Sequence, residues 1–101
     1  MSSSMHVLVA EIELHVRSAQ SLKEKRSVVT SIVRNLDQLH GVAAAEVEHQ
    51  ELWQRAGLGV AVVGGTPGAV EEVMDSVERH VWSRTEVDVI EFTTSWWEGD
   101  D

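Results

Sequence analysis

The chain has 101 residues, which is enough for one hydrophobic core of ordinary size and too few for two. Hydrophobic residues make up 43% and charged residues 25%, as in globular proteins, and the lack of cysteine excludes disulfides, thiolate nucleophiles and cysteine-bound metals. Seventeen acidic residues against eight basic ones give a formal net charge of −9. General DNA or RNA binding is therefore not expected, although one local basic patch could still contact RNA.

No stretch of the sequence approaches the roughly 18 consecutive apolar residues that a membrane span needs. Residues 1–5 also lack the charged-then-apolar pattern of a secretion signal. We therefore expect a cytoplasmic protein that does not enter membranes. Its single domain is predicted to span residues 5–97, with flexible ends at residues 1–4 and 98–101.

The first two predicted elements are a strand and a helix. Residues 6–16 repeat with a period of two, which predicts a half-buried strand. Its two sides would carry Leu8, Ala10, Ile12, Leu14 and Val16, and Val7, Val9, Glu11, Glu13 and His15. Residues 21–24 (SLKE) form a capping box, which is typical of a helix start, and Gly41 supplies a left-handed end. The apolar face of this helix is predicted to contain Leu22, Val29, Ile32, Val33, Leu36 and Leu39.

The remaining residues predict a hairpin, a second helix and a fourth strand. Residues 42–49 and 55–63 form the hairpin. Its first strand is expected to point Ala43, Ala45 and Val47 one way and Ala44, Glu46 and Glu48 the other. Its second strand sets Ala56, Leu58, Val60 and Val62 opposite Arg55, Gly57, Gly59 and Ala61. Thr66 and Pro67 are a favourable start for an amphipathic helix, and residues 87–96 are rich in β-branched and aromatic residues, as strands are.

The predicted order is β-α-β-β-α-β. Two right-handed crossovers joined by a hairpin favour a four-stranded antiparallel sheet in the order 4-1-3-2, with both helices on one face. This is the ferredoxin-like, or split βαβ, arrangement of the α+β class. The predicted core consists of Leu8, Ile12, Leu22, Val29, Val33, Leu36, Leu58, Val60, Val73, Val77 and Phe92.

Several segments together resemble the YlxP-like family of small bacterial proteins, a domain of unknown function. They are MHV at residues 5–7, SLKEKR at 21–26, AEVEH at 45–49, and LWQRA at 52–56 running into LGVAVV at 58–63. The resemblance covers residues 5–96 and implies a ferredoxin-like fold and a bacterial cytosolic location. Genes of the family often lie beside those for translation initiation factor two and ribosome-binding factor A, which implies work linked to the ribosome. The family has no established catalytic residues to transfer.

A basic cluster at the start of the first helix is the first candidate site. It consists of Arg17, Lys23, Lys25 and Arg26, half of the basic residues of the chain. Cations in a first helical turn oppose the helix dipole, so a bound anion, a phosphate or RNA would compensate for them. The alternative is that they pair with carboxylates on a solvated surface.

The face of the sheet opposite the helices is the second candidate. It is predicted to carry Glu11, Glu13, His15, Glu46, Glu48 and Glu91 around a trough floored by the small residues of the third strand. Such a face, with one histidine among its carboxylates, would suit a cationic partner. It could also be simply solvated, or covered by a second copy of the chain.

Tryptophan and arginine in the hairpin connection form the third candidate, because these residue types dominate interface hot spots. Trp53 is expected either at the edge of the core or in an interface. Arg55 is expected to form a hydrogen bond with a carboxylate of the preceding strand. Of Trp96 and Trp97, alternation leaves one exposed, and Trp97 is the interface candidate.

No catalytic motif is recognisable: the sequence has no GxSxG elbow, no phosphate-loop lysine and no HxH or HExxH metal spacing. We therefore assign no catalytic residue, cofactor or metal. The leading hypothesis is a non-enzymatic interaction module that forms a homodimer and acts near the translation machinery, with a ribosome-associated protein or RNA as its partner. The alternative is a small enzyme or a ligand- or cation-binding protein that uses Glu11, Glu13, His15 and Glu91.

Overall fold

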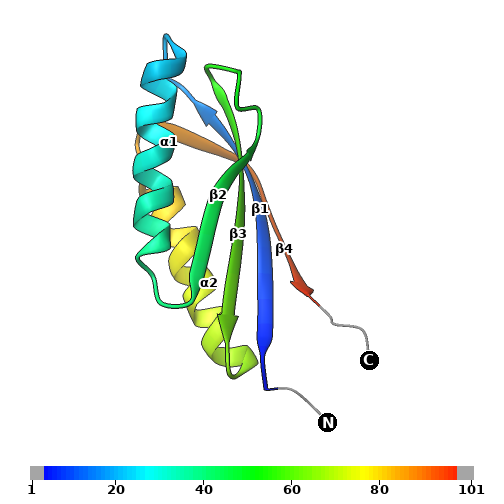
Figure 1. Ribbon diagram of the computed structural model, residues 1–101. Coiled ribbons are helices and arrows are strands. Elements are labelled where there is room, and N and C mark those ends of the chain that lie inside the picture. The colour runs from blue at the N-terminus through cyan, green and yellow to red at the C-terminus, as the bar shows by residue number, and fades with distance from the viewer. Residues whose placement is uncertain (1–3, 98–101) are drawn as a thin grey trace.

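The computed structural model describes residues 4–97, and the predicted order β-α-β-β-α-β is confirmed (Figure 1). The elements are β1 (His6–Val16), α1 (Leu22–Asp37), β2 (Val42–Glu48), β3 (Arg55–Gly64), α2 (Pro67–Ser83) and β4 (Val87–Trp97). The predicted flexible ends fall, apart from Ser4, outside the described residues.

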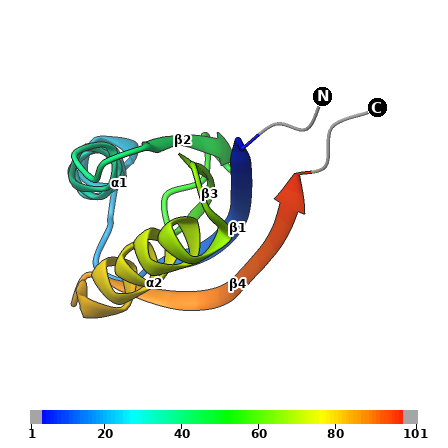
Figure 2. The ribbon, with the colours of Figure 1, turned by 90° about the horizontal axis from the view of Figure 1, so that it is seen from below.

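The four strands form one antiparallel sheet in the order β2-β3-β1-β4, as predicted. Both helices lie on the same face, and the view along the strands shows the sheet curling around α2 (Figure 2). The opposite face is covered by no element of residues 4–97. This α+β arrangement is the ferredoxin-like fold.

Side-chain caps begin both helices where the sequence predicts them. At α1 the Ser21 hydroxyl accepts a hydrogen bond from the Glu24 amide at 3.1 Å, and the Glu24 carboxylate accepts one from the Gln20 amide at 2.7 Å. At α2 the Thr66 hydroxyl accepts from the Ala69 amide at 3.1 Å. Each cap satisfies amides that have no partner within the helix.

Helix α1 ends at Asp37, two residues before Leu39, the last apolar position of the predicted helix face. The Leu39 amide donates to the Leu36 carbonyl at 3.0 Å, which tightens the last turn. Gly41 then adopts a φ of +79°, and a Cβ at this position would lie 2.5 Å from the Val63 carbonyl oxygen. The turn into β2 therefore requires glycine for its conformation and for its close approach to β3.

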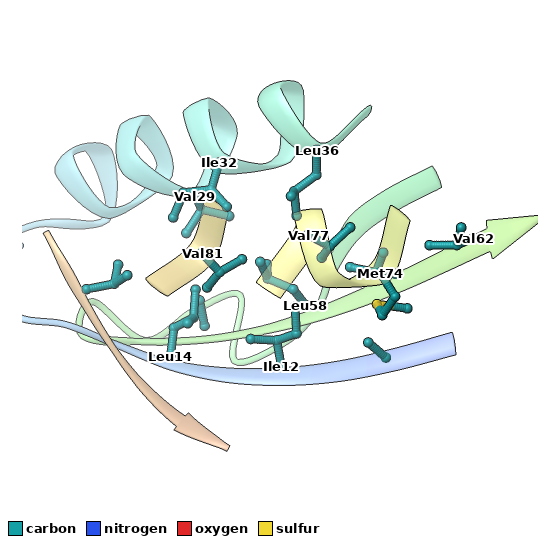
Figure 3. Close-up of a cluster of buried hydrophobic side chains, with 14 of the residues drawn as sticks. Ile12, Leu14, Val29, Ile32, Leu36, Leu58, Val62, Met74, Val77 and Val81 are labelled. Atoms are coloured by element: carbon teal, nitrogen blue, oxygen red, sulfur yellow. The ribbon is translucent and has the colours of Figure 1, made fainter. Parts of the chain in front are cut away.

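The core lies between the sheet and the two helices, where α1 and α2 point their apolar faces at β1 and β3 (Figure 3). The predicted core residues of β1 and β3, together with Val29, Leu36 and Val77, are buried, and Val33, Val73 and Phe92 pack partly buried against them. Leu22 does not belong to the core cluster. It is the first residue of α1, and on this face the first wholly buried side chain is that of Lys25.

Two register shifts interrupt the regular alternation of the strands. Between β2 and β3 the shift lies between Glu46 and Glu48 and leaves Val47 without a partner. Between β1 and β4 it leaves Ile90 without a partner, so that Glu13 pairs with Glu91 and Leu14 with Val89. Each extra residue reverses the side of the sheet to which the following residues point.

Candidate functional site

Acidic side chains gather on one part of the uncovered sheet face, beside the second half of β1. We call this part the acidic end of the face. Glu11 and Glu13 lie there as predicted, with Glu91 directly opposite Glu13. Glu48 pairs with Gly57 and lies very close to it: a Cβ added to Gly57 would lie 2.6 Å from the Glu48 Cβ. These four carboxylate residues line a hollow of about 170 Å³ together with Ile12, Val47, Gly57 and Leu58. The predicted acidic trough is therefore present, although Val47 and Glu48 fill part of its floor.

Glu46 does not belong to this face, contrary to the prediction. It pairs with Leu58 of β3, whose side chain is buried in the core, so Glu46 points toward the helices. The bulge at Val47 then returns Glu48 to the uncovered face. Simple alternation assigns both residues to one face because it assumes that no extra residue interrupts the strand.

The prediction that Lys25 belongs to an anion-binding cluster is also wrong. Its side chain is wholly buried and cannot reach an external anion. Its ammonium group forms an ion pair with Glu46 and donates a hydrogen bond to the His49 carbonyl at 2.8 Å. Lys25 precedes Val29, Ile32 and Leu36 by four, seven and eleven residues, which are the spacings of one helix face. That spacing is the sequence signal that would have placed it inside.

His49 connects this buried pair to the acidic end, and no motif in the sequence singles it out. Its backbone has a φ of +61°, and its carbonyl also accepts from the Leu52 amide at 3.1 Å. Its imidazole Nε2 lies 2.9 Å from a carboxylate oxygen of Glu13. A histidine in the left-handed region is uncommon, and here contacts on both sides hold it in place.

Arg55 forms its ion pair with Glu13 of β1, at 3.2 Å, and not with a carboxylate of the preceding strand. The prediction fails because β2 ends at Glu48, opposite Gly57, and no β2 residue reaches Arg55. Arg55 lies directly opposite His15 in β1, two residues from Glu13 in the same strand. Two cationic or protonatable groups, Arg55 and His49, therefore flank the Glu13 carboxylate.

Arg17 binds groups of the protein itself at the start of β4. Its guanidinium forms an ion pair with Asp88 and donates hydrogen bonds to the carbonyls of Thr85 and Val87. The His15 imidazole, which we expected beside glutamates, lies 3.4 Å from the same Asp88 carboxylate. Arg17 is exposed as well, but of the predicted basic cluster only Lys23 and Arg26 form no ion pair within residues 4–97.

The connection between β2 and β3 presents apolar side chains on a fixed backbone. The Gln54 carbonyl accepts from the Val16 amide at 2.9 Å, and the Gln54 side chain donates to the Ala19 carbonyl at 3.3 Å. These bonds tie the connection to the last residue of β1 and to the loop before α1, at the same end of the molecule (Figure 1). Trp53 nevertheless is 54% exposed, and Leu52 is exposed too. Trp53 is therefore not at the edge of the core.

The other end of the uncovered face is apolar. A shallow hollow of about 340 Å³ lies over β1, β2 and β3, lined by Val9, Ala10, Glu11, Ala43, Ala44, Ala45, Val47, Gly59, Val60 and Ala61. Trp97 pairs with Val7 beside it and is 54% exposed. Trp96 is exposed as well, on the helix side opposite Leu8, so alternation was wrong in expecting one of the two to be covered.

The described residues hold no ready metal site and no membrane span. Among residues 4–97, no three His, Asp or Glu side chains come together in a way that could hold a metal ion. Neither helix there has the length and apolarity needed to cross a membrane. What the site offers chemically is a sheet face with one acidic and one apolar end.

Residues 7–94 match the model of a family described as protein of unknown function (DUF503). The chain belongs to this family. It is 31% identical to the uncharacterized protein YlxP of Bacillus subtilis (strain 168), over 86% of this chain and 95% of that protein. The resemblance to the YlxP-like family is thereby confirmed.

Two solved structures match most of the chain. One is a mutant of SnoaB, a cofactor-independent oxygenase from Streptomyces nogalater, with a TM-score of 0.51 at 10% identity, over 98% of this chain and 96% of that one. The other is the de novo designed protein Foldit4, with a TM-score of 0.46 at 13% identity, over 88% and 96% of the two chains. At 10% identity the likeness to SnoaB concerns the fold alone.

Proposed function

We propose that this protein is a non-enzymatic, cytoplasmic interaction module that forms a homodimer through the apolar end of its uncovered sheet face. The observation that carries the proposal is the row of apolar side chains on that face. It comprises Val7 and Val9 of β1, Ala43, Ala45 and Val47 of β2, Ala61 and Val63 of β3, and Trp97 of β4. Contiguous exposed apolar surface of this kind typically marks an interaction site.

The net charge of the chain limits the orientations in which a second copy can bind. Two chains that each carry a formal charge of −9 repel one another unless their carboxylates are kept apart. In a two-fold dimer the same patch meets itself at the axis. If the apolar ends meet there, Glu13, Glu48 and Glu91 point away from their counterparts, and Glu11, which lines both hollows, lies at the border of the interface.

The test is the oligomeric state of a variant with a charge in the patch. Ala61 lies in the middle of it, opposite Val9 of β1 and Ala43 of β2. Sedimentation equilibrium should find a dimer for the natural protein and a monomer for Ala61→Asp. Ala69→Asp is the matched control, because Ala69 is exposed in the first turn of α2; it should remain dimeric.

Far-UV circular dichroism must be the same for all three proteins, so that loss of the dimer is not loss of the fold. A natural protein that is monomeric at the highest attainable concentration, or an Ala61→Asp variant that stays dimeric, would reject the proposal.

The alternative is a ligand or cation at the acidic hollow, which the grouping of Glu11, Glu13, Glu48 and Glu91 favours. A small organic amine that raises the melting temperature of the natural protein, but not that of Glu11→Gln, would support this alternative. The expected link to the translation machinery is a separate prediction. Co-sedimentation of the dimer with ribosomal particles would support it.

A further inference from the structure

The outward face of α1 carries a stripe of cations and polar groups. Lys23, Arg26 and Arg34 are exposed, and Ser27 and Thr30 lie between them at helical spacing. Lys23 and Arg34 are eleven residues apart, which is about 16 Å along the helix axis. We call these five residues the α1 stripe.

The cations of the α1 stripe are unpaired, although the chain has more than twice as many acidic as basic residues. Arg17, Lys25, Arg55 and Arg84 each form an ion pair with a carboxylate. Within residues 4–97, Lys23, Arg26 and Arg34 form none. In an acidic protein, three adjacent free cations make the outside of α1 a local exception to the negative charge.

The chemistry of this surface distinguishes a nucleic acid from a protein partner. A shallow hollow of about 520 Å³ on α1 is lined wholly by polar residues: Lys23, Arg26, Ser27, Thr30, Ser31, Arg34, Asn35 and Gln38. Protein interfaces have apolar or aromatic residues at their centre, and this hollow has none. Phosphate and sugar groups of nucleic acids are bound by these very side-chain types, arginine, lysine, serine, threonine, asparagine and glutamine.

We propose that the α1 stripe binds the sugar-phosphate backbone of single-stranded RNA. A single strand fits because the stripe is one helix wide. Hydroxyl and amide groups beside the cations can bond to the 2′-hydroxyl, the group by which proteins distinguish RNA from DNA.

The binding is weak, independent of sequence and dependent on salt. Three cations neutralise three phosphates, so the logarithm of the affinity should fall against the logarithm of the salt concentration with a slope of about −2. Each cation removed should reduce the slope by about 0.7. The inference does not rest on the proposed dimer, because α1 and the uncovered face lie on opposite sides of the sheet (Figure 2).

The experiment measures fluorescence anisotropy of a labelled oligouridine at several low salt concentrations. Arg34→Gln should reduce the slope, and Lys23→Gln, Arg26→Gln and Arg34→Gln together should bring it close to zero. Arg79→Gln is the matched control, since Arg79 is an exposed arginine on α2 that forms no ion pair within residues 4–97. It should leave the slope unchanged.

Three results would overturn the inference: no binding by the natural protein, an equal loss with Arg79→Gln, or equal affinity for oligothymidine of the same length. Ala61→Asp should bind oligouridine with the slope of the natural protein. A dimer that fails to bind RNA would contradict this inference alone, and an RNA-binding monomer would contradict the proposed dimer alone.

Discussion

Lys25 of α1 forms an ion pair with Glu46 of β2, and its side chain is wholly buried at the edge of the core. The pair joins the first turn of α1 to the last regular pair of β2, just before the bulge at Val47. The His49 carbonyl accepts a further hydrogen bond from the same ammonium group at 2.8 Å. We predicted from the sequence that Lys25 and Glu46 lie on separate surfaces, but they form one internal contact.

Breaking this ion pair from one side should destabilise the fold strongly. Lys25→Met leaves the Glu46 carboxylate without its partner in a mostly buried position, which typically costs about 3–5 kcal/mol. The free energy of unfolding from urea denaturation measures the loss. Lys25→Met combined with Glu46→Leu should recover most of it, because no unpaired charge is then buried. A single variant as stable as the natural protein would contradict the buried pair.

Leu36→Ala should cost about 2–5 kcal/mol, because Leu36 is fully buried between α1, α2 and the sheet (Figure 3). The comparison is Thr30→Ala on the exposed face of the same helix, which should change the free energy of unfolding by less than about 0.5 kcal/mol. Urea denaturation of both variants tests the assignment. A loss below about 1 kcal/mol for Leu36→Ala would mean that the buried face of α1 is wrong.

His80 should make the fold less stable as the pH falls below neutral. Burial, together with the Arg84 guanidinium, holds the pKa of His80 below its usual value of 6.5. The unfolded chain therefore takes up a proton first, and the stability that neutral His80 contributes above pH 6.5 is lost as the pH falls through the folded pKa. Urea midpoints between about pH 7 and 5 should depend less on pH in His80→Gln.

Glu86 affects stability in a lower pH range than His80, so a Glu86 variant is a control for the effect of His80. Hydrogen bonds from the Arg84 side chain, then a backbone hydrogen bond, lower the pKa of Glu86 below 4.5. Its contribution is present above pH 4.5 and is lost as the pH falls through the folded pKa. Glu86→Gln should therefore flatten the pH dependence below 4.5 and leave the His80 range unchanged. The same pH profile in His80→Gln as in the natural protein would contradict the effect of His80.

Trp53→Ala should change neither the free energy of unfolding by more than about 0.5 kcal/mol nor the oligomeric state. Trp53 is 54% exposed, and its connection lies at the acidic end of the sheet, away from the proposed dimer surface. Trp82→Ala, at an exposed tryptophan of α2, is the matched comparison. A clear loss of stability would mean that Trp53 packs at the edge of the core. Dissociation of a dimer would mean that Trp53 lies in the dimer interface.

Much of the fold could be predicted because its signals are local. Ser21 and Thr66 begin helices through hydrogen bonds to residues three positions along, so four residues of sequence are sufficient to recognise them. The alternation in β1 and β3 is uninterrupted, and the sides it predicts are those observed. Of the candidate site, Glu11, Glu13, Glu48 and Glu91 were placed correctly on the uncovered face.

The contacts of the site depended on the tertiary structure. Arg55 reaches Glu13 because β3 pairs with β1 in a register that sets Arg55 opposite His15, and no residue near Arg55 in sequence encodes that register. Glu46 points inward, where Lys25 meets it, because β2 pairs with β3 in a register that sets Glu46 opposite Leu58; the extra residue at Val47 then returns Glu48 to the uncovered face. The sequence alone determined the order of the elements and the buried faces of both helices, β1 and β3, since periodicity and caps are properties of neighbouring residues. Which charges pair was decided by the bulge and the strand register, because these arise only when distant segments form hydrogen bonds with each other.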